Sequence, residues 1–183
     1  QPYSPAAGTG LSSHELNQPG CYRFVKDTTV TAQFEITEDS WRNILTSSSQ
    51  LATKQPWGKP YFLAWTTTPW TLAANSALCV GPKIDYVAVE TFNPYTAAPV
   101  TVVMAEARLN AYFKQEGKNA DFEAYKAGDK IIPWRVVEHY KGTDLENSHY
   151  EQLLPMISPI GEGAFRVILG DYVTTEDGTG IVH

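Results

Sequence analysis

The chain has 183 residues, of which 43% are hydrophobic and 19% are charged, and its formal net charge is −6. This length and composition suit one globular domain with its own core and exclude a disordered chain. The negative charge excludes a protein that grips long nucleic acid by its own electrostatics, because phosphate binding needs a surplus of Lys and Arg.

Membrane insertion and disulfide formation are not expected. The sequence has no run of the ~20 apolar residues that span a bilayer, and no basic-then-apolar N-terminus of the kind that directs secretion. Cys21 and Cys79 lie far apart in apolar or aromatic surroundings, which favours buried free thiols in a reducing compartment. We therefore expect a cytoplasmic protein without a membrane partner.

The first half of the chain predicts a linker followed by strands. Residues 1–20 are rich in Pro, Gly, Ser and Ala and predict a linker ribbon ahead of one domain over residues 21–183. Residues 28–36 alternate apolar and polar side chains, as in a half-buried strand. Residues 46–60 predict a polar loop, and the apolar run 61–67, which stops before Pro69, predicts a buried strand.

The second half predicts further strands and one helical block. Strands are expected over residues 85–90 and 99–104, and helices over 105–115 and 120–126. Residues 130–140, 164–173 and 179–183 again look extended, with a turn at Asp177-Gly178. The mixed order predicts an α+β, mainly β fold, namely a barrel-like mixed sheet with a few flanking helices.

The most unusual segment is residues 65–75, Trp-Thr-Thr-Thr-Pro-Trp-Thr-Leu-Ala-Ala-Asn. One interpretation is a strand edge followed by a turn, because Thr favours strands and Pro ends them. The other is a pocket wall, in which Thr methyl groups gauge a small aliphatic side chain and Thr hydroxyls bind polar atoms. Composition alone leaves both interpretations open.

This segment resembles the threonine-rich peptide of isoleucyl-tRNA synthetase editing domains, which are insertions in the catalytic domain of class I aminoacyl-tRNA synthetases. Residues 8–15, 26–30, 142–145 with 150–151, and 176–183 resemble further segments of the same domain, in the same order along the chain. Related valyl and leucyl editing domains usually have Arg-Pro-Glu or Arg-Pro-Asp where this chain has Thr68-Pro69-Trp70. They also lack His at the position of His183, so the isoleucyl type is favoured.

The resemblance implies a hydrolase that removes valine wrongly attached to tRNA(Ile) and so keeps translation accurate. The residues it implies as catalytic are Thr66, Thr67, Thr68, Thr71 and Asn75. Either Trp65 or Trp70 would stack on the terminal adenine, and His183 would bound the amino-acid side chain. The sequence shows no Ser/His/Asp or Cys/His set, so a positioned water is the expected nucleophile. Thr hydroxyls and N–H groups beside Pro69 would hold this water and stabilise the oxyanion.

The resemblance also sets expectations about cofactors and partners. No metal or cofactor is expected in the editing domain, because Ser4 and Ala7 stand where many relatives carry a zinc-binding Cys pair, and ATP and Mg²⁺ serve only the synthetic domain. The expected partners are the valine-carrying 3′ end of tRNA(Ile) and the rest of a parent synthetase.

Family members continue after the residue matching His183 with an Ala-Pro pair and an Asp that holds the substrate ammonium. The domain is therefore expected to be truncated at its C-terminal end and to deacylate valyl-tRNA poorly, because the ammonium would lack a carboxylate partner. The alternative to a hydrolase is a non-catalytic module that binds an aminoacyl or peptide end.

Overall fold

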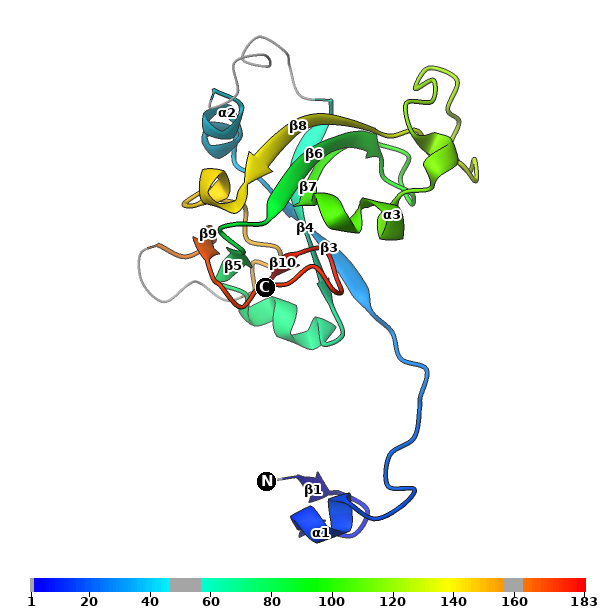
Figure 1. Cartoon of the computed structure of the whole chain (residues 1–183), viewed down its shortest axis with the longest axis vertical. Coiled ribbons are helices and arrows are strands. Elements are labelled where there is room, and N and C mark those ends of the chain that lie inside the picture. The colour runs from blue at the N-terminus through cyan, green and yellow to red at the C-terminus, as the bar shows by residue number, and fades with distance from the viewer. Residues whose placement is uncertain (1, 47–56, 157–162) are drawn as a thin grey trace.

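A computed structural model describes residues 2–46, 57–156 and 163–183 (Figure 1). The strands of these residues form a five-stranded sheet, a three-stranded sheet and a two-stranded hairpin. The predicted α+β, mainly β class is confirmed, although the described strands lie in separate sheets and do not close into one barrel.

The five-stranded sheet is the centre of the domain. Its strand order is β3 (Val30–Glu35), β4 (Lys59–Thr66), β7 (Pro99–Ala105), β6 (Asp85–Phe92) and β8 (Arg135–Lys141). β4 and β7 are parallel, and the other neighbours are antiparallel. β7 is buried from Val100 to Ala105, as its almost continuous apolar sequence requires of a strand covered on both faces.

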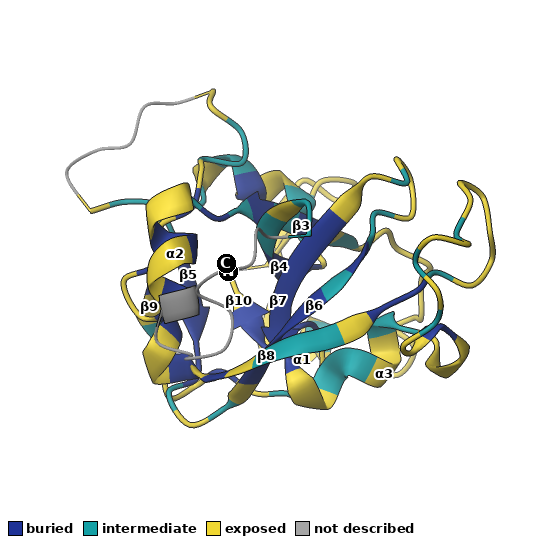
Figure 2. Ribbon diagram, turned by 90° about the horizontal axis from the view of Figure 1, so that it is seen from above, coloured by how far each residue is buried: buried dark blue, intermediate teal, exposed yellow. Residues whose placement is uncertain are grey.

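The three-stranded sheet packs on one face of the larger sheet. Its order is β10 (Ile181–Val182), β5 (Ala77–Val80) and β9 (Arg166–Leu169), with β5 and β9 parallel. The core that includes both sheets contains, among others, Phe34, Phe62, Ala64, Leu78, Val80, Tyr86, Val103, Val167 and Ile181. Figure 2 shows the buried residues gathered on the central strands.

A second core lies on the other face of the large sheet. It contains Leu63, Val87, Val89, Val100, Val102, Met104 and Trp134, against which Leu109, Tyr112 and Phe113 pack. These last residues come from α3 (Leu109–Tyr112) and its C-terminal end, which follow the 3-10 turn η2 (Glu106–Arg108). The large sheet is therefore covered on both faces, most fully along β6 and β7.

Several short elements complete the domain. α2 (Glu38–Thr46) buries Trp41 and Ile44 against the first core, and its first turn is capped by Thr37 Oγ1, which accepts from the Ser40 N–H at 3.4 Å. The 3-10 turns are η1 (Pro69–Ala74), η3 (Gln115–Gly117) and η4 (Gly142–Leu145). No helix of the described residues is long and apolar enough to cross a membrane.

The predicted linker ribbon has structure of its own. It contains β1 (Tyr3–Ser4), β2 (Thr9–Gly10) and α1 (Ser13–Leu16), and Figure 1 shows it apart from the two sheets. Ser12 and Glu15 form a capping box at the start of α1. Cys21, expected to be buried, is exposed, whereas Cys79 is buried as predicted, and both thiols are free.

The predicted strands are mostly confirmed, but the helical block is not. The helix expected over residues 105–115 is divided between η2 and α3, and residues 120–126 form no helix. In the second segment the Asp121 carboxylate accepts from the Glu123 N–H at 2.9 Å, a local bond that competes with helix formation. Most of the loop expected over residues 46–60 lies outside the described residues.

Candidate functional site

A cavity of about 540 Å³ opens where η1 meets the three-stranded sheet. Its lining residues are Thr68, Thr71, Ala74, Asn75, Ser76, Ala77, Cys79, Ile168, Tyr172, Val182 and His183. Four residues predicted from the sequence, namely Thr68, Thr71, Asn75 and His183, therefore share one cavity, whose volume is typical of small-molecule sites.

The threonines form a chain of hydrogen bonds. Thr66 is buried at the end of β4, and its Oγ1 accepts from the Thr68 N–H at 3.0 Å. The hydroxyl oxygens of Thr66 and Thr68 are 3.3 Å apart, and those of Thr68 and Thr71 are also 3.3 Å apart. The Thr71 hydroxyl ends the chain by donating to the Thr68 carbonyl at 2.7 Å.

The direction of the protons in this chain follows from the last bond. A hydroxyl has one proton to donate and two lone pairs with which to accept. Because the Thr71 proton is directed at a carbonyl, Thr71 accepts from Thr68, and Thr68 in turn accepts from Thr66. Thr68 and Thr71 therefore offer lone pairs to the cavity and suit a ligand group that donates.

Asn75 gives the same wall a donor. It lies at the C-terminal end of η1, where its backbone N–H donates to the Leu72 carbonyl at 3.2 Å. Its Nδ2 donates to the Ala77 carbonyl at 2.8 Å, and its Oδ1 accepts from the Tyr150 hydroxyl at 2.6 Å. An amide nitrogen has two protons, so one N–H of Asn75 remains for a ligand.

His183 follows β10, and the backbone before it is fixed by the large sheet. Tyr86, which is fully buried, donates its hydroxyl proton to the Gly180 carbonyl at 2.7 Å and accepts from the Gly81 N–H at 2.9 Å. The Thr179 hydroxyl donates to the Leu63 carbonyl at 2.6 Å. Gly180 has φ +75°, and a Cβ there would lie 2.4 Å from the Ala105 Cβ, so a side chain does not fit.

Burial affects the chemistry of the cavity's titratable groups. It lowers the pKa of His183, which favours the neutral imidazole. A hydrogen bond with Cys79, together with burial, raises the pKa of Tyr172. None of the lining residues that the structure describes is Asp, Glu, Lys or Arg, so this wall carries no permanent charge.

The other predicted site residues do not line this cavity. Thr66 is joined to the cavity wall through the contact of its hydroxyl with that of Thr68. Thr67 is exposed, and Trp70 is 71% exposed at the start of η1. Trp65 faces the opposite side of β4 from Thr66, because successive strand residues alternate. Its ring packs on Gly178, where an added Cβ would lie 3.3 Å from Trp65 Cε3.

The sequence interpretation missed the residues of the far wall. Cys79 comes from β5, Ile168 from β9, and Tyr172 from the loop after β9, where its side chain is 68% exposed. Parallel pairing of β5 with β9 joins segments almost ninety residues apart, with Cys79 opposite Ile168. Val182 differs from these residues, because it directly precedes the predicted residue His183 in the chain.

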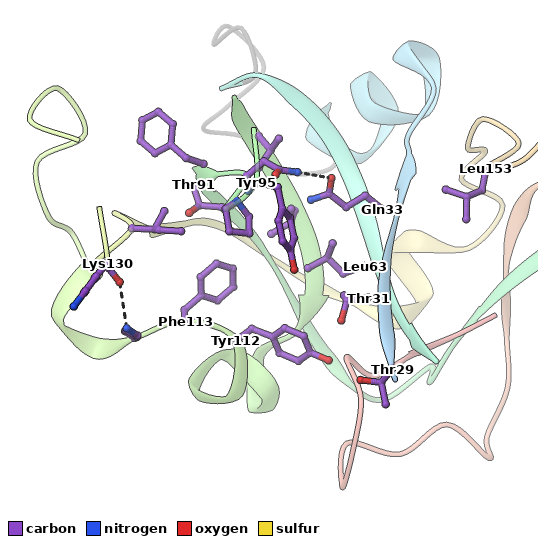
Figure 3. A pocket seen from close by; sticks show the side chains of 17 residues that line it. Thr29, Thr31, Gln33, Leu63, Thr91, Tyr95, Tyr112, Phe113, Lys130 and Leu153 are labelled. Carbon is purple, nitrogen blue, oxygen red and sulfur yellow. Dashed lines mark hydrogen bonds between the residues drawn. The ribbon is translucent and has the colours of Figure 1, made fainter. Parts of the chain in front are cut away.

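A larger cavity of about 650 Å³ lies on the other face of the large sheet (Figure 3). Leu63, Val100 and Val102 form part of its lining, along with Tyr112 and Phe113. It contains none of the predicted site residues, and its lining has no His, Cys or carboxylate among the residues described. In the same described ranges, no three His, Cys, Asp or Glu side chains gather to hold a metal ion.

The chain is similar over its whole length to isoleucine–tRNA ligases. It is 65% identical over 183 residues to the enzyme of Bacteroides fragilis, 40% over 196 residues to that of Treponema denticola and 36% over 186 residues to that of Picrophilus torridus. All of the chain is covered in each case, but it spans only 15%, 16% and 13% of these proteins. No family model matches the chain.

Solved structures show the same fold. The P. falciparum cytosolic leucyl-tRNA synthetase editing domain matches with a TM-score of 0.56 at 13% identity, covering 84% of this chain and 60% of that one. The P. knowlesi editing domain matches with a TM-score of 0.56 at 14% identity, covering 87% and 59%. The resemblance stated from the motifs is therefore confirmed, by sequence for the isoleucyl type and by structure for the fold.

Proposed function

We propose that this chain, which matches isoleucine–tRNA ligases over all of its residues and has the fold of synthetase editing domains, hydrolyses the ester between valine and tRNA(Ile). The observation that carries the proposal is the cavity in which Thr68, Thr71, Asn75 and His183 meet. These residues come from two segments of the chain that resemble the isoleucyl editing domain. The partners would be the charged tRNA 3′ end and the rest of a parent ligase.

The polarity of the wall suits attack by water on an ester. A water molecule that donates to Thr68 and Thr71 keeps its own lone pair for the ester carbonyl carbon. As the carbonyl oxygen becomes negative, the remaining N–H of Asn75 can donate to it. The bond from carbon to the ribose oxygen then breaks, that oxygen takes one water proton, and the other proton passes to solvent.

The threonines and Asn75 have different roles in this reaction. The threonine hydroxyls hold the water by accepting, and their own protons are already directed into the chain and at the Thr68 carbonyl. They are therefore poorly placed to stabilise the oxyanion, which we assign to Asn75. The apolar far wall of Ile168 and Val182 faces the amino-acid side chain together with His183.

Selection of valine over isoleucine would depend on size. One methylene changes binding in an apolar pocket by only about 1–3 kcal/mol, a magnitude for which isoleucyl-tRNA synthetases are themselves the reference case. A second site that admits valine and refuses the longer isoleucine removes the residual error. Tyr172, exposed on the cavity rim, is the lining aromatic that would stack on the terminal base.

The test is an ester-loss assay with valyl-tRNA(Ile) and isoleucyl-tRNA(Ile), run with this chain and with a full-length isoleucine–tRNA ligase carrying it. We expect loss of valine and retention of isoleucine. Thr68→Val should reduce the loss at least tenfold, as removal of a transition-state contact does. Thr143→Val, which alters an exposed threonine outside the cavity, should not.

The assay also separates the hydrolase from its alternative. Binding of valyl-tRNA without ester loss in both proteins would favour a non-catalytic module that recognises an aminoacyl end. Equal loss of valine and isoleucine would contradict the proposed selectivity while leaving hydrolysis in place. A full-length ligase unaffected by Thr68→Val would contradict the site.

A further inference from the structure

We infer that Tyr150 is a positioning residue of this site, whose hydroxyl orients Asn75 so that one amide N–H faces the cavity. The inference rests on the proposed function, because it assigns a role within the same reaction. Tyr150 does not line the cavity, and it acts only through Asn75.

The ring of Tyr150 is buried in the first core. Its side chain is 2% exposed and meets Phe34 edge-to-face, with ring centroids 5.2 Å apart, and Phe165 at 6.1 Å. Its backbone N–H donates to the Phe165 carbonyl at 2.9 Å. A ring fixed in this way places its hydroxyl at one point, 2.6 Å from Asn75 Oδ1.

Phe165, which pairs with Tyr150, also binds the backbone next to Asn75. The Phe165 N–H donates to the Ser76 carbonyl at 2.7 Å, so Tyr150, Phe165 and Ser76 are linked in series. The following residue, Glu151, donates its N–H to the Glu35 carbonyl at 2.7 Å, at the end of β3. The end of η1 is therefore tied to the core by its backbone and, through Tyr150, by its side chain.

The Tyr150 hydroxyl restrains the Asn75 side chain in a way that the backbone bonds do not. An Asn side chain can rotate about its bonds, and the Ala77 carbonyl alone fixes only that an N–H points toward it. A second bond at Oδ1 fixes the plane of the amide and thus the direction of the remaining N–H. Burial raises the pKa of the Tyr150 phenol, so this group stays protonated and continues to donate.

The matched pair of variants is Tyr150→Phe and Tyr140→Phe. Both remove one phenol oxygen from a tyrosine of the same core, but the Tyr140 hydroxyl has no hydrogen-bond partner among the described residues. In valyl-tRNA(Ile) deacylation we expect Tyr150→Phe to lower kcat about tenfold with KM within about twofold, because only the transition-state contact is disturbed. Tyr140→Phe should retain the wild-type values.

A double-mutant cycle with Asn75→Ala separates positioning from a general loss of stability. Asn75→Ala should lower kcat about a hundredfold, as loss of an oxyanion donor does. If Tyr150 acts through Asn75, the double variant should be no slower than Asn75→Ala alone. Multiplied losses would show that the two residues act independently and would overturn the inference.

Two further outcomes have defined meanings. If folded Tyr150→Phe hydrolyses valyl-tRNA(Ile) with the wild-type kcat, the positioning role of Tyr150 is overturned and the proposed function is not. A wild-type ligase that does not hydrolyse valyl-tRNA(Ile) would overturn the proposed function and this role with it. Should Tyr150→Phe fail to fold, NMR of the wild-type Asn75 side-chain amide decides: a rigid amide supports the inference, and a freely rotating one contradicts it.

Discussion

Tyr86→Phe tests how the two sheets are joined. The substitution keeps the fully buried ring but removes the hydroxyl that donates to the Gly180 carbonyl at 2.7 Å and accepts from the Gly81 N–H at 2.9 Å. Both glycines are buried, so both backbone groups lose a partner without gaining water. An unsatisfied buried group costs about 1–3 kcal/mol, so we expect the free energy of unfolding to fall by about 3 kcal/mol.

Urea unfolding followed by tryptophan fluorescence measures this difference. The midpoint should fall while the slope stays constant, because the surface exposed on unfolding is nearly unchanged. Tyr140→Phe is the control, since it removes a buried hydroxyl that has no partner in the described part of the chain. If Tyr86→Phe cost no more than Tyr140→Phe, the proposed link between the sheets would be refuted.

Three further predictions concern the candidate site and the backbone that supports it. Thr71→Val should reduce ester loss at least tenfold while Thr71→Ser retains most of it, because the hydroxyl is what accepts from the water; equal rates in kinetic assays of the two variants would contradict this. Gly180→Ala should lower the urea midpoint, because its Cβ would lie 2.4 Å from that of Ala105 and φ is +75°, and an unchanged midpoint would count against the close contact. The His183 imidazole should titrate by NMR below its ordinary pKa of about 6.5, because burial favours the neutral form. Between the lowered pKa of the folded state and the ordinary pKa of the unfolded chain, the unfolded chain binds more protons at His183. The free energy of unfolding therefore rises with pH in this range. The stability that the neutral imidazole contributes is present above the unfolded pKa and is lost as pH falls through the folded pKa.

The sequence predicted elements whose pattern is local and missed those that depend on contacts. β3 and β7 were visible as alternating or continuous apolar runs, and their observed bounds lie close to the predicted ones. β5 was missed because four residues are too few to show a period, and its burial comes from neighbours on both sides. α2 was missed because its buried apolar residues Trp41 and Ile44 stand among polar side chains over most of the helix.

In the candidate site, too, the residues that are close in sequence could be predicted and those brought together by strand pairing could not. Thr68, Thr71 and Asn75 are close in sequence, so a composition signal could locate one wall. Tyr172 lies opposite them only because β9 pairs with β5, and no nearby residue type marks that position. Trp65 was placed in the site by its neighbours along the chain, whereas the alternation of a strand directs it to the other face.

The cavity is built from two bodies, since the threonine wall continues β4 of the large sheet and the wall of Cys79, Ile168 and His183 belongs to the small one. The width of the cavity is therefore set by the distance between the two packed sheets. Side chains between the sheets, such as Leu78 and Val80, set that separation although they do not line the cavity. We expect changes of one methylene there to shift the size limit of the cavity, although every lining residue stays the same.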